Sequence, residues 1–405
     1  MIPVRWRVFV GGEELAGKAF SGAVHWGRDT VDDQPAGAVA SVVVSDPDGT
    51  IAAAATVTAP MDLYAVVGGY EFQRFAGSVV DVSVDHAAGE TTIVGADELG
   101  RLSRTFVGDE PWPQESDGDR VGRILTLAGV DLQAAGPWNA QTGTWQQAPD
   151  TWRVARVPNV DGGTVQILAR DVDRKPVLGL LHDTANDAAG VVWADQHGIV
   201  QYRDALHRPA ATERDIPAGM FDTAAVFQRG TGGMVNRLGV KYGEPESVVT
   251  VQDDASIATY GMFAWERNTE LAVAAEVDSL ARQVVAWRRV PRWTTPVLVC
   301  DTAHVGDADS LGWLLGAGVG AAFRLVGVGA PNPGGESSAG LVLEGGTDSF
   351  TGERLSLTLA CSNLRQTAPP VTWAQVPPGD TWASIDQQVQ WFDADDLYPP
   401  MAEVA

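Results

Sequence analysis

The sequence is poor in cysteine. Only Cys300 and Cys361 occur in 405 residues, and each lies at the end of an apolar, strand-like run. We expect two buried thiols, with a disulfide between them as the alternative. A structural zinc site needs four ligands, and no histidine lies at a CxxC-type spacing from either cysteine. The two cysteines therefore cannot form a zinc site by themselves.

Long hydrophobic runs are also absent. The first residues, MIPVRWRVFVGGEELAG, lack the continuous apolar core of a signal peptide. The longest apolar run, residues 311–323, is too short and too rich in glycine to span a bilayer. We expect no export signal and no stable membrane insertion.

Basic residues are scarce. The chain has 28 Lys and Arg against 52 Asp and Glu, a formal net charge of −24. Nucleic-acid binding needs clustered basic side chains that displace counterions from the phosphates. This composition argues against sequence-specific nucleic-acid binding, and an acidic surface would repel a DNA strand that passes close to it.

Catalytic motifs are missing as well. The sequence has no GxxxxGK[ST] phosphate loop, no G-x-S-x-G elbow and no carboxylate pair that stands out among its many acidic residues. Residues 316–321, GAGVGA, match the G-x-G-x-x-A dinucleotide pattern, but a helix should follow and residues 323–328 favour a strand. We expect no cofactor and no enzymatic activity.

The histidines give only a weak metal signal. His182, Asp183, Asp195, His197 and His207 fall within one stretch and could converge on a metal ion. The pattern places His197 in a hairpin turn and His207 in a loop, where a solvated polar residue needs no metal to explain it. We therefore predict no metal site.

What the sequence does contain is turns. Its 45 glycines and 23 prolines are spread along the chain, which favours short strands and an α+β fold that is predominantly β. The clearest helix is expected over residues 269–289, capped by Asn268 or Thr269, between strands at residues 237–242 and 296–300. Its buried face is predicted by apolar spacing of three and four residues at Val273, Val277, Leu280, Val284 and Trp287.

Four regions are expected along the chain. Residues 1–105 form a β-rich unit, 106–230 an inserted small α+β module, 231–366 a second β-rich unit with the long helix, and 367–405 a tryptophan-rich C-terminal arm. The hairpin predicted at residues 74–98 resembles the one at 338–363 in pattern. Two similar β units would then flank the insertion.

The C-terminal arm repeats a tryptophan every nine residues, at Trp373, Trp382 and Trp391. Spaced tryptophans on an acidic, proline-containing segment are typical of anchors that each fill a pocket on a partner. The alternative is that these residues are strands of the preceding core.

Several stretches together carry a family resemblance: HWGRDTVDDQPAGAVASVVVSD, RFAGSVVDVSV, EPWPQESDGDRVGRILTLAGVDL, VNRLGVKYG followed by DDASIATYG, and TWAQVPPGDTWASIDQQVQWF. They resemble the minor tail proteins of long-tailed actinobacteriophages, which are similar to the tail hub (baseplate hub) proteins of other tailed phages. The resemblance covers nearly the whole chain, but none of its motifs is catalytic.

This resemblance implies a homotrimer at the tail tip of the virion, made in the host cytoplasm. Two tube-like β-barrel domains per subunit, with covering helices, would form a pseudo-sixfold ring that joins the tail tube to the host-recognition apparatus and lets DNA pass through its lumen. The implied partners are the tail tube or distal tail protein, the tape measure protein, and receptor-binding or other minor tail proteins.

Two other functions remain open from the residues alone. A carbohydrate-binding adhesin of the tail tip would use exposed aromatic rings, and the 106–230 module has Trp138, Trp145 and Trp152 in or beside its glycine-rich loop. A wall hydrolase is disfavoured because no catalytic constellation supports it.

Overall fold

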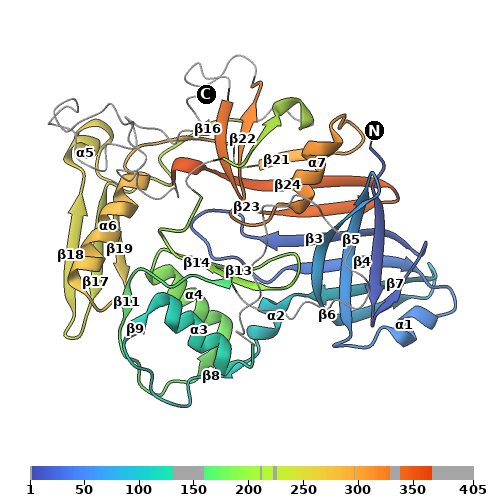
Figure 1. Ribbon diagram of the computed structural model, residues 1–405, viewed down its shortest axis with the longest axis horizontal. Coiled ribbons are helices and arrows are strands. Elements are labelled where there is room, and N and C mark those ends of the chain that lie inside the picture. The colour runs from blue at the N-terminus through green and yellow to red at the C-terminus, as the bar shows by residue number, and fades with distance from the viewer. Residues whose placement is uncertain are drawn as a thin grey trace.

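The protein is described from a computed structural model. The structure describes residues 2–130, 159–209, 212–221, 226–295, 297–328 and 338–366. Within these residues it is a mixed α+β fold in which strands predominate, as the glycine- and proline-rich composition predicts (Figure 1). The fold has three parts: one large sheet, a small module of helices and short strands, and a three-stranded sheet covered by a helix.

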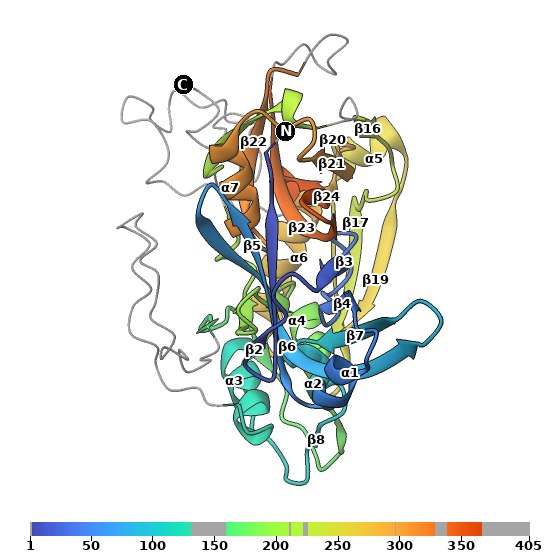
Figure 2. The same ribbon diagram turned by 90° about the vertical axis from the view of Figure 1, so that its right-hand side faces the viewer.

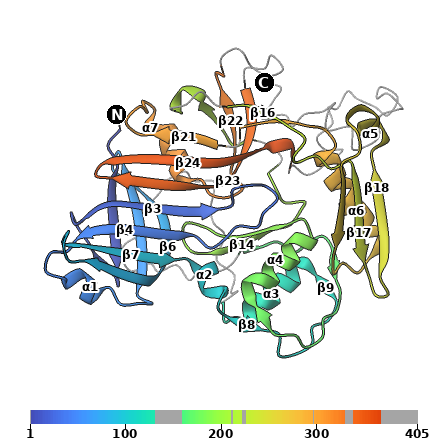
Figure 3. The same ribbon diagram turned by 180° about the vertical axis from the view of Figure 1, so that it is seen from behind.

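The large sheet has twelve strands, drawn from both ends of the described chain. In spatial order it runs through β15 (Arg214–Pro217), β22 (Ala322–Val326), β23 (Ser338–Thr351), β3 (Ala19–Gly27), β4 (Val39–Ser45), β7 (Glu90–Ala96), β6 (Tyr70–Asp85), β5 (Pro60–Val67), β1 (Arg5–Val10) and β2 (Glu13–Glu14). On the other edge of β23 lie β24 (Arg354–Asn363) and then β21 (Val297–Asp301). All of these pairs are antiparallel except β15 with β22, and Figure 3 shows β24, β23, β3, β4 and β7 stacked in that order.

The expected pair of closed barrels is not what these strands form. Among the described residues no strand order closes on itself, and strands of both expected β units belong to one open sheet. The reason is β3, which pairs with β4 on one edge and with residues 345–351 of β23 on the other. Hydrophobic alternation predicts each hairpin but carries no information on which distant strand lies beside it.

The sheet nevertheless contains a repeated unit. The first repeat consists of β4, the helix α1 (Thr50–Ala54), β5, β6 and β7, and the second consists of β21, the helix α7 (Ala308–Gly316), β22, β23 and β24. In space the strands follow β4-β7-β6-β5 and β21-β24-β23-β22, so each pairing of the first repeat has a counterpart in the second. The similarity of the two hairpins that the sequence indicates therefore extends to the topology around them.

The long hairpins of the two repeats contain a β-bulge at corresponding positions. The register shifts between Val79 and Asp81 in β6 and between Leu343 and Gly345 in β23. A bulge bends its strand and changes the direction of its free edge. Before the bulge, β6 pairs with β5 and β23 pairs with β22; beyond it, β23 pairs with β3, whereas residues 81–85 of β6 have no second strand among the described residues.

The inserted module packs its two longer helices, α3 and α4, against each other and against short strands. It comprises α2 (Glu98–Leu102), β8 (Phe106–Val107), β9 (Glu115–Ser116), α3 (Asp117–Leu127), β10 (Asn159–Val160), β11 (Gln166–Ile167), β12 (Lys175–Pro176), α4 (Val177–Asp187), β13 (Val191–Ala194) and β14 (Val200–Arg203). Ser116 caps α3, because its side chain accepts a hydrogen bond from the Asp119 amide. Residues 191–203 form a hairpin in which β13 pairs with β14.

The three-stranded sheet consists, in spatial order, of β18 (Ser247–Gln252), β17 (Arg237–Tyr242) and β19 (Ala264–Asn268). The helix α6 (Ala274–Arg288) packs against it. Figure 2 shows this sheet lying along one side of the large one. The remaining elements are β16 (Gln228–Arg229), α5 (Asp254–Tyr260), β20 (Trp293–Thr294) and the short 3-10 turns η1 (Ala218–Met220) and η3 (Leu364–Gln366).

The long helix begins later than its sequence suggests. Val277, Leu280, Val284 and Trp287 are buried as predicted, but residues 264–268 form β19, parallel to β17, and α6 starts at Ala274. The predicted cap at Asn268 or Thr269 is wrong, because Asn268 ends β19 and the Thr269 hydroxyl donates to the carbonyl of Lys241. The residue before the first turn of α6 is Val273, whose side chain makes no capping hydrogen bond. Tertiary pairing here outweighs the local capping signal.

Both cysteines are buried thiols, as expected. Cys300 lies on β21 and Cys361 on β24, and the register of that pair sets Cys300 opposite Leu357. Burial raises the pKa of the Cys361 thiol well above its usual range. The two residues act as small apolar side chains of the core.

Candidate functional site

Two adjoining cavities lie where the three parts of the fold meet. One, of about 510 Å³, is lined by the end of β3, the strands β13 and β14, and the turn before β22. The other, of about 350 Å³, is lined by residues after β3, the end of α4, β19 and α6. Arg28 and Arg208 line both cavities, so the two spaces share a wall. Clefts between parts of a fold are common places for binding sites.

Arginines stacked on tryptophans line these cavities. The guanidinium carbon lies 5.9 Å from the ring centre for Arg203 over Trp193, 5.7 Å for Arg208 over Trp287, and 5.1 Å for Arg267 over Trp265. Arg288 also lies over Trp265, at 5.6 Å. Such stacking holds a cation near an aromatic face without neutralising its charge. The junction is therefore locally basic in a strongly acidic chain.

Some of these arginines already have carboxylate partners. Arg28 forms a buried ion pair with Glu344 at 2.5 Å, and Ser362 donates a hydrogen bond to the same carboxylate. Arg288 pairs with Asp32, and Arg203 lies 3.2 Å from Asp161. These contacts fix three of the side chains and leave no net charge to bind a ligand at those positions.

Arg208 and Arg267 differ, because neither forms an ion pair with a carboxylate in the part of the chain that the structure describes. Arg208 donates to the carbonyl of Ala189 at 2.7 Å, while its Nε is buried and has no hydrogen-bond partner there. Arg267 donates to the carbonyl of Asn186. Burial lowers the pKa of Arg208 to about 10 and lowers that of Arg267 as well. A pKa of about 10 leaves the Arg208 guanidinium charged at neutral pH.

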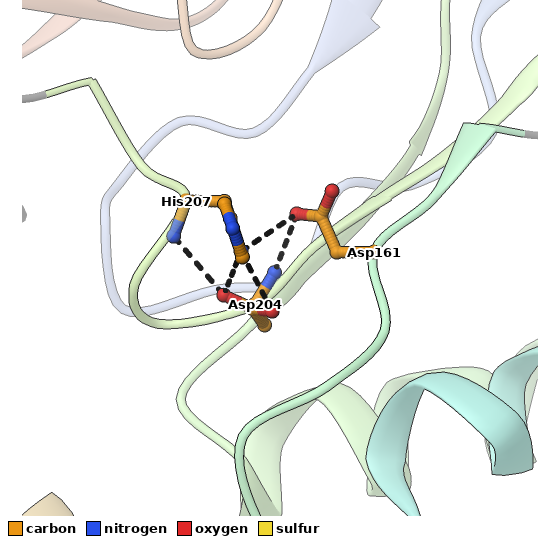
Figure 4. A group of neighbouring side chains, drawn as sticks. All are labelled: Asp161, Asp204 and His207. Carbon is orange, nitrogen blue, oxygen red and sulfur yellow. Dashed lines mark hydrogen bonds and ion pairs between the residues drawn. The ribbon is translucent and has the colours of Figure 1, made fainter.

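One residue that lines the larger cavity, His207, belongs to a cluster of possible metal ligands. Asp161, Asp204 and His207 have ligand atoms within 4.8 Å of one another (Figure 4). His207 Nδ1 lies 2.8 and 2.9 Å from the two Asp204 oxygens, and this hydrogen bond raises the pKa of the imidazole. Asp161 is engaged by Arg203 and by the amide of Asp204, at 3.2 Å each. The three possible ligands thus already have hydrogen-bond partners, and the charge of Arg203 would repel a cation.

The other residues considered for a metal are dispersed. His182 contacts the carbonyl of Pro35 at 3.1 Å, and His197 contacts the Gln73 side chain at 2.8 Å. The Asp195 carboxylate accepts the amides of its own hairpin turn. Within the described ranges, only His207 of the predicted set joins a ligand cluster, and Asp183 does not.

The glycine-rich segment at residues 316–321 has no dinucleotide geometry. The strand β22 follows it directly, as predicted, where the motif requires a helix. Residues 318–321 instead form part of the wall of the larger cavity. The segment contributes shape to the junction and no phosphate-binding helix end.

The predicted docking tryptophans, Trp373, Trp382 and Trp391, lie outside the described residues, and so do Trp138, Trp145 and Trp152 of the module. Their contacts stay predictions. Among the described residues, no helix combines the length and the apolar composition that crossing a membrane requires.

Comparison with known proteins finds likeness in structure alone. No protein-family model matches the sequence, and a search of curated proteins gives no significant match. The 43 kDa tail protein of prophage MuSo2 from Shewanella oneidensis has a TM-score of 0.53 at 10% identity, covering 91% of this chain and 99% of that one. The tail protein from Neisseria meningitidis MC58 has a TM-score of 0.53 at 12% identity, covering 91% and 100%.

A third similar structure is the prophage tail protein gp18 from Listeria monocytogenes EGD-e, with a TM-score of 0.50 at 12% identity over 88% of this chain and 94% of that one. At such low identities the likeness establishes the fold. The chain shares the architecture of tail proteins over about nine-tenths of its length, while an origin in an actinobacteriophage stays a prediction.

Proposed function

We propose that the chain is a structural, non-enzymatic phage tail protein that forms the hub ring at the tail tip. The observation that carries this proposal is the internal repeat in which β3 joins the first unit to the second. A joint that exists once inside the chain, between two similar units, can be repeated between chains to close a ring. The fold that the chain shares with tail proteins supports the same assignment.

The edges for such a joint are open in the described part of the chain. Residues 81–85 of β6 occupy the position that residues 345–351 of β23 occupy in the second repeat, and only the latter has β3 beside it. The outer edge of β21 corresponds to the edge of β4 that β3 covers, and among the described residues no strand pairs with it. Open strand edges favour pairing with another chain.

In this proposal three copies supply six repeats around a central lumen. The ring joins the tail tube or distal tail protein to the receptor-binding and other minor tail proteins, and it lets DNA pass beside the tape measure protein. The net charge of −24 supports a lumen to which DNA does not adhere. Neither a cofactor nor sequence-specific nucleic-acid binding is part of the function.

The test is assembly of the purified full chain, measured by native mass spectrometry and negative-stain imaging. We expect a three-membered ring with a central hole. Val84→Lys adds a charge at the open edge of β6, where Val84 is already exposed, and should abolish the ring. The matched control is Val248→Lys on β18, an exposed edge strand of the other sheet, which should leave the ring intact.

A monomer at all concentrations would refute the hub assignment. A ring that tolerates Val84→Lys would instead keep the hub and reject this edge as its joint. Binding of the full chain to defined cell-wall glycans, without ring formation, would favour the adhesin reading of the sequence.

A further inference from the structure

The junction cavities hold more positive charge than the surrounding fold neutralises. Arg208 and Arg267 line the smaller cavity without an ion pair in the described residues, and the Arg208 Nε has no acceptor there. The carboxylate of Asp187 acts on the charge of Arg267 without forming an ion pair with it. A buried donor left without an acceptor is costly, and a buried cation without an anion more so. The cavity is thus built to receive an anionic group.

The geometry fits a planar or tetrahedral oxyanion beside an apolar group. A guanidinium presents its donors in a planar fork that matches a carboxylate or a phosphate, and this chain is rich in carboxylates. The rings of Trp265 and Trp287 line the same space beside the arginines, so an apolar side chain next to the carboxylate also finds a surface. The fitting ligand is a peptide segment with acidic and aromatic side chains.

This chain contains such a segment, and it starts at the cavity. Gln366, the last described residue, lines the smaller cavity. The arm that follows, residues 367–405, has no lysine or arginine. Its acidic residues are Asp380, Asp386, Asp393, Asp395, Asp396 and Glu403. An extended chain covers roughly 3.3–3.6 Å per residue, so every one of these carboxylates can return to the cavity.

We propose that the acidic C-terminal arm folds back on its own chain and sets its carboxylates against Arg208 and Arg267. The tryptophan spacing predicts that the arm docks on a partner, whereas here the arm docks in a cavity of its own chain. It does not depend on ring formation. In this proposal the arm occupies a site between the large sheet, the inserted module and the three-stranded sheet.

The experiment measures how fast chymotrypsin cuts the full chain after the arm's aromatic residues, with cleavage at Trp373, Trp382 and Trp391 followed by mass spectrometry. Arg208→Gln with Arg267→Gln should speed cleavage about tenfold, the loss of roughly one charge-assisted contact. The matched control is Arg282→Gln with Arg324→Gln, which removes two arginines from surface ion pairs and should leave the rate unchanged.

A second variant keeps the test independent of the cavity's own folding. Replacing Asp393, Asp395 and Asp396 by Asn should raise the cleavage rate in the same way, and adding it to the arginine variant should cause no further increase. An unchanged rate in both variants would overturn the proposal. Protection that rises with protein concentration would also overturn it, since the arm would then occupy another copy.

Discussion

Two regions of this molecule hold arginines whose guanidinium groups differ in what they contact: buried ones between the two repeats and half-buried ones at the junction. Between the two repeats, Arg74 of β6 pairs with Asp348 of β23 at 2.6 Å, and Arg28 pairs with Glu344. At the junction, Arg208 and Arg267 contact only carbonyls and rings among the described residues. The first arginines have carboxylate partners within the sheet, whereas the second form no ion pair among the described residues.

The ion pair of Arg74 with Asp348 has a structural role. Asp348 is fully buried and also accepts a hydrogen bond from the indole of Trp26 on β3, so one carboxylate ties both repeats to the strand that joins them. Removing an internal partner should therefore destabilise the fold, and removing a junction arginine should not.

The largest effect is expected for Asp348→Ala. The substitution leaves the Arg74 guanidinium buried without its anion, which should lower the free energy of unfolding by about 3–5 kcal/mol. Chemical denaturation of the full chain measures the loss. The double variant Arg74→Met with Asp348→Leu removes both charges and should be less destabilised than the single one. A loss below about 1 kcal/mol for Asp348→Ala would remove the distinction between the two regions.

A pH-dependent effect of intermediate size is expected at Asp187, close to Arg267. Burial raises the pKa of Asp187 to about 7, although its carboxylate accepts the amide of Glu270 at 2.9 Å. The folded chain thus binds this proton more tightly than the unfolded chain. The stability contributed by protonated Asp187 is present in full below about pH 4 and is lost as the pH rises through 7.

Asp187→Asn keeps an acceptor for the amide and removes the titration. The variant should match the native chain at pH 4 and exceed it at pH 8 by about 1–3 kcal/mol, since one pKa unit corresponds to about 1.4 kcal/mol. Thermal unfolding across this pH range measures the difference. Asp183→Asn, at an exposed position on the same helix, should produce no stability difference of this size between pH 4 and pH 8.

A smaller effect is expected for Arg208→Met. The side chain loses one hydrogen bond to a carbonyl and its stacking on Trp287, but no carboxylate among the described residues loses an ion-pair partner. The free energy of unfolding should change by no more than about 1 kcal/mol in either direction. A loss as large as that of Asp348→Ala would show that the junction arginine is structural too.

The sequence predicts local elements well where one face is buried and alternation or helical spacing marks it. The hairpins of β6–β7, β13–β14 and β23–β24 and the buried face of α6 are all indicated by their residues. What it does not predict is pairing between distant segments. The contact of β3 with β23 joins residues more than three hundred positions apart, and the expectation of two separate barrels fails at that pair.

The junction site escapes sequence reasoning for the same reason. Its arginines come from the end of β3, the segment after β14, β19 and the end of α6, which meet only in the folded chain. A partial signal was present, since Arg267 and Arg288 each lie within two residues of a tryptophan. Proximity of arginine and tryptophan in the sequence, however, does not reveal which guanidinium lacks a carboxylate.

The smallest effect is expected where an arginine pairs with a carboxylate at the surface. Arg324 on β22 contacts Asp215 on β15 at 2.7 Å, and about half of the Asp215 side chain is exposed. Water solvates either charge when the other is removed, so Asp215→Ala should cost no more than about 1 kcal/mol. The two variants are measured in the same denaturant. The difference between their losses of unfolding free energy gives the part of the Arg74–Asp348 contribution that comes from burial and not from ion pairing alone. Equal losses at the two positions would mean that the solvent reaches Asp348 and that the joint between the repeats opens in solution.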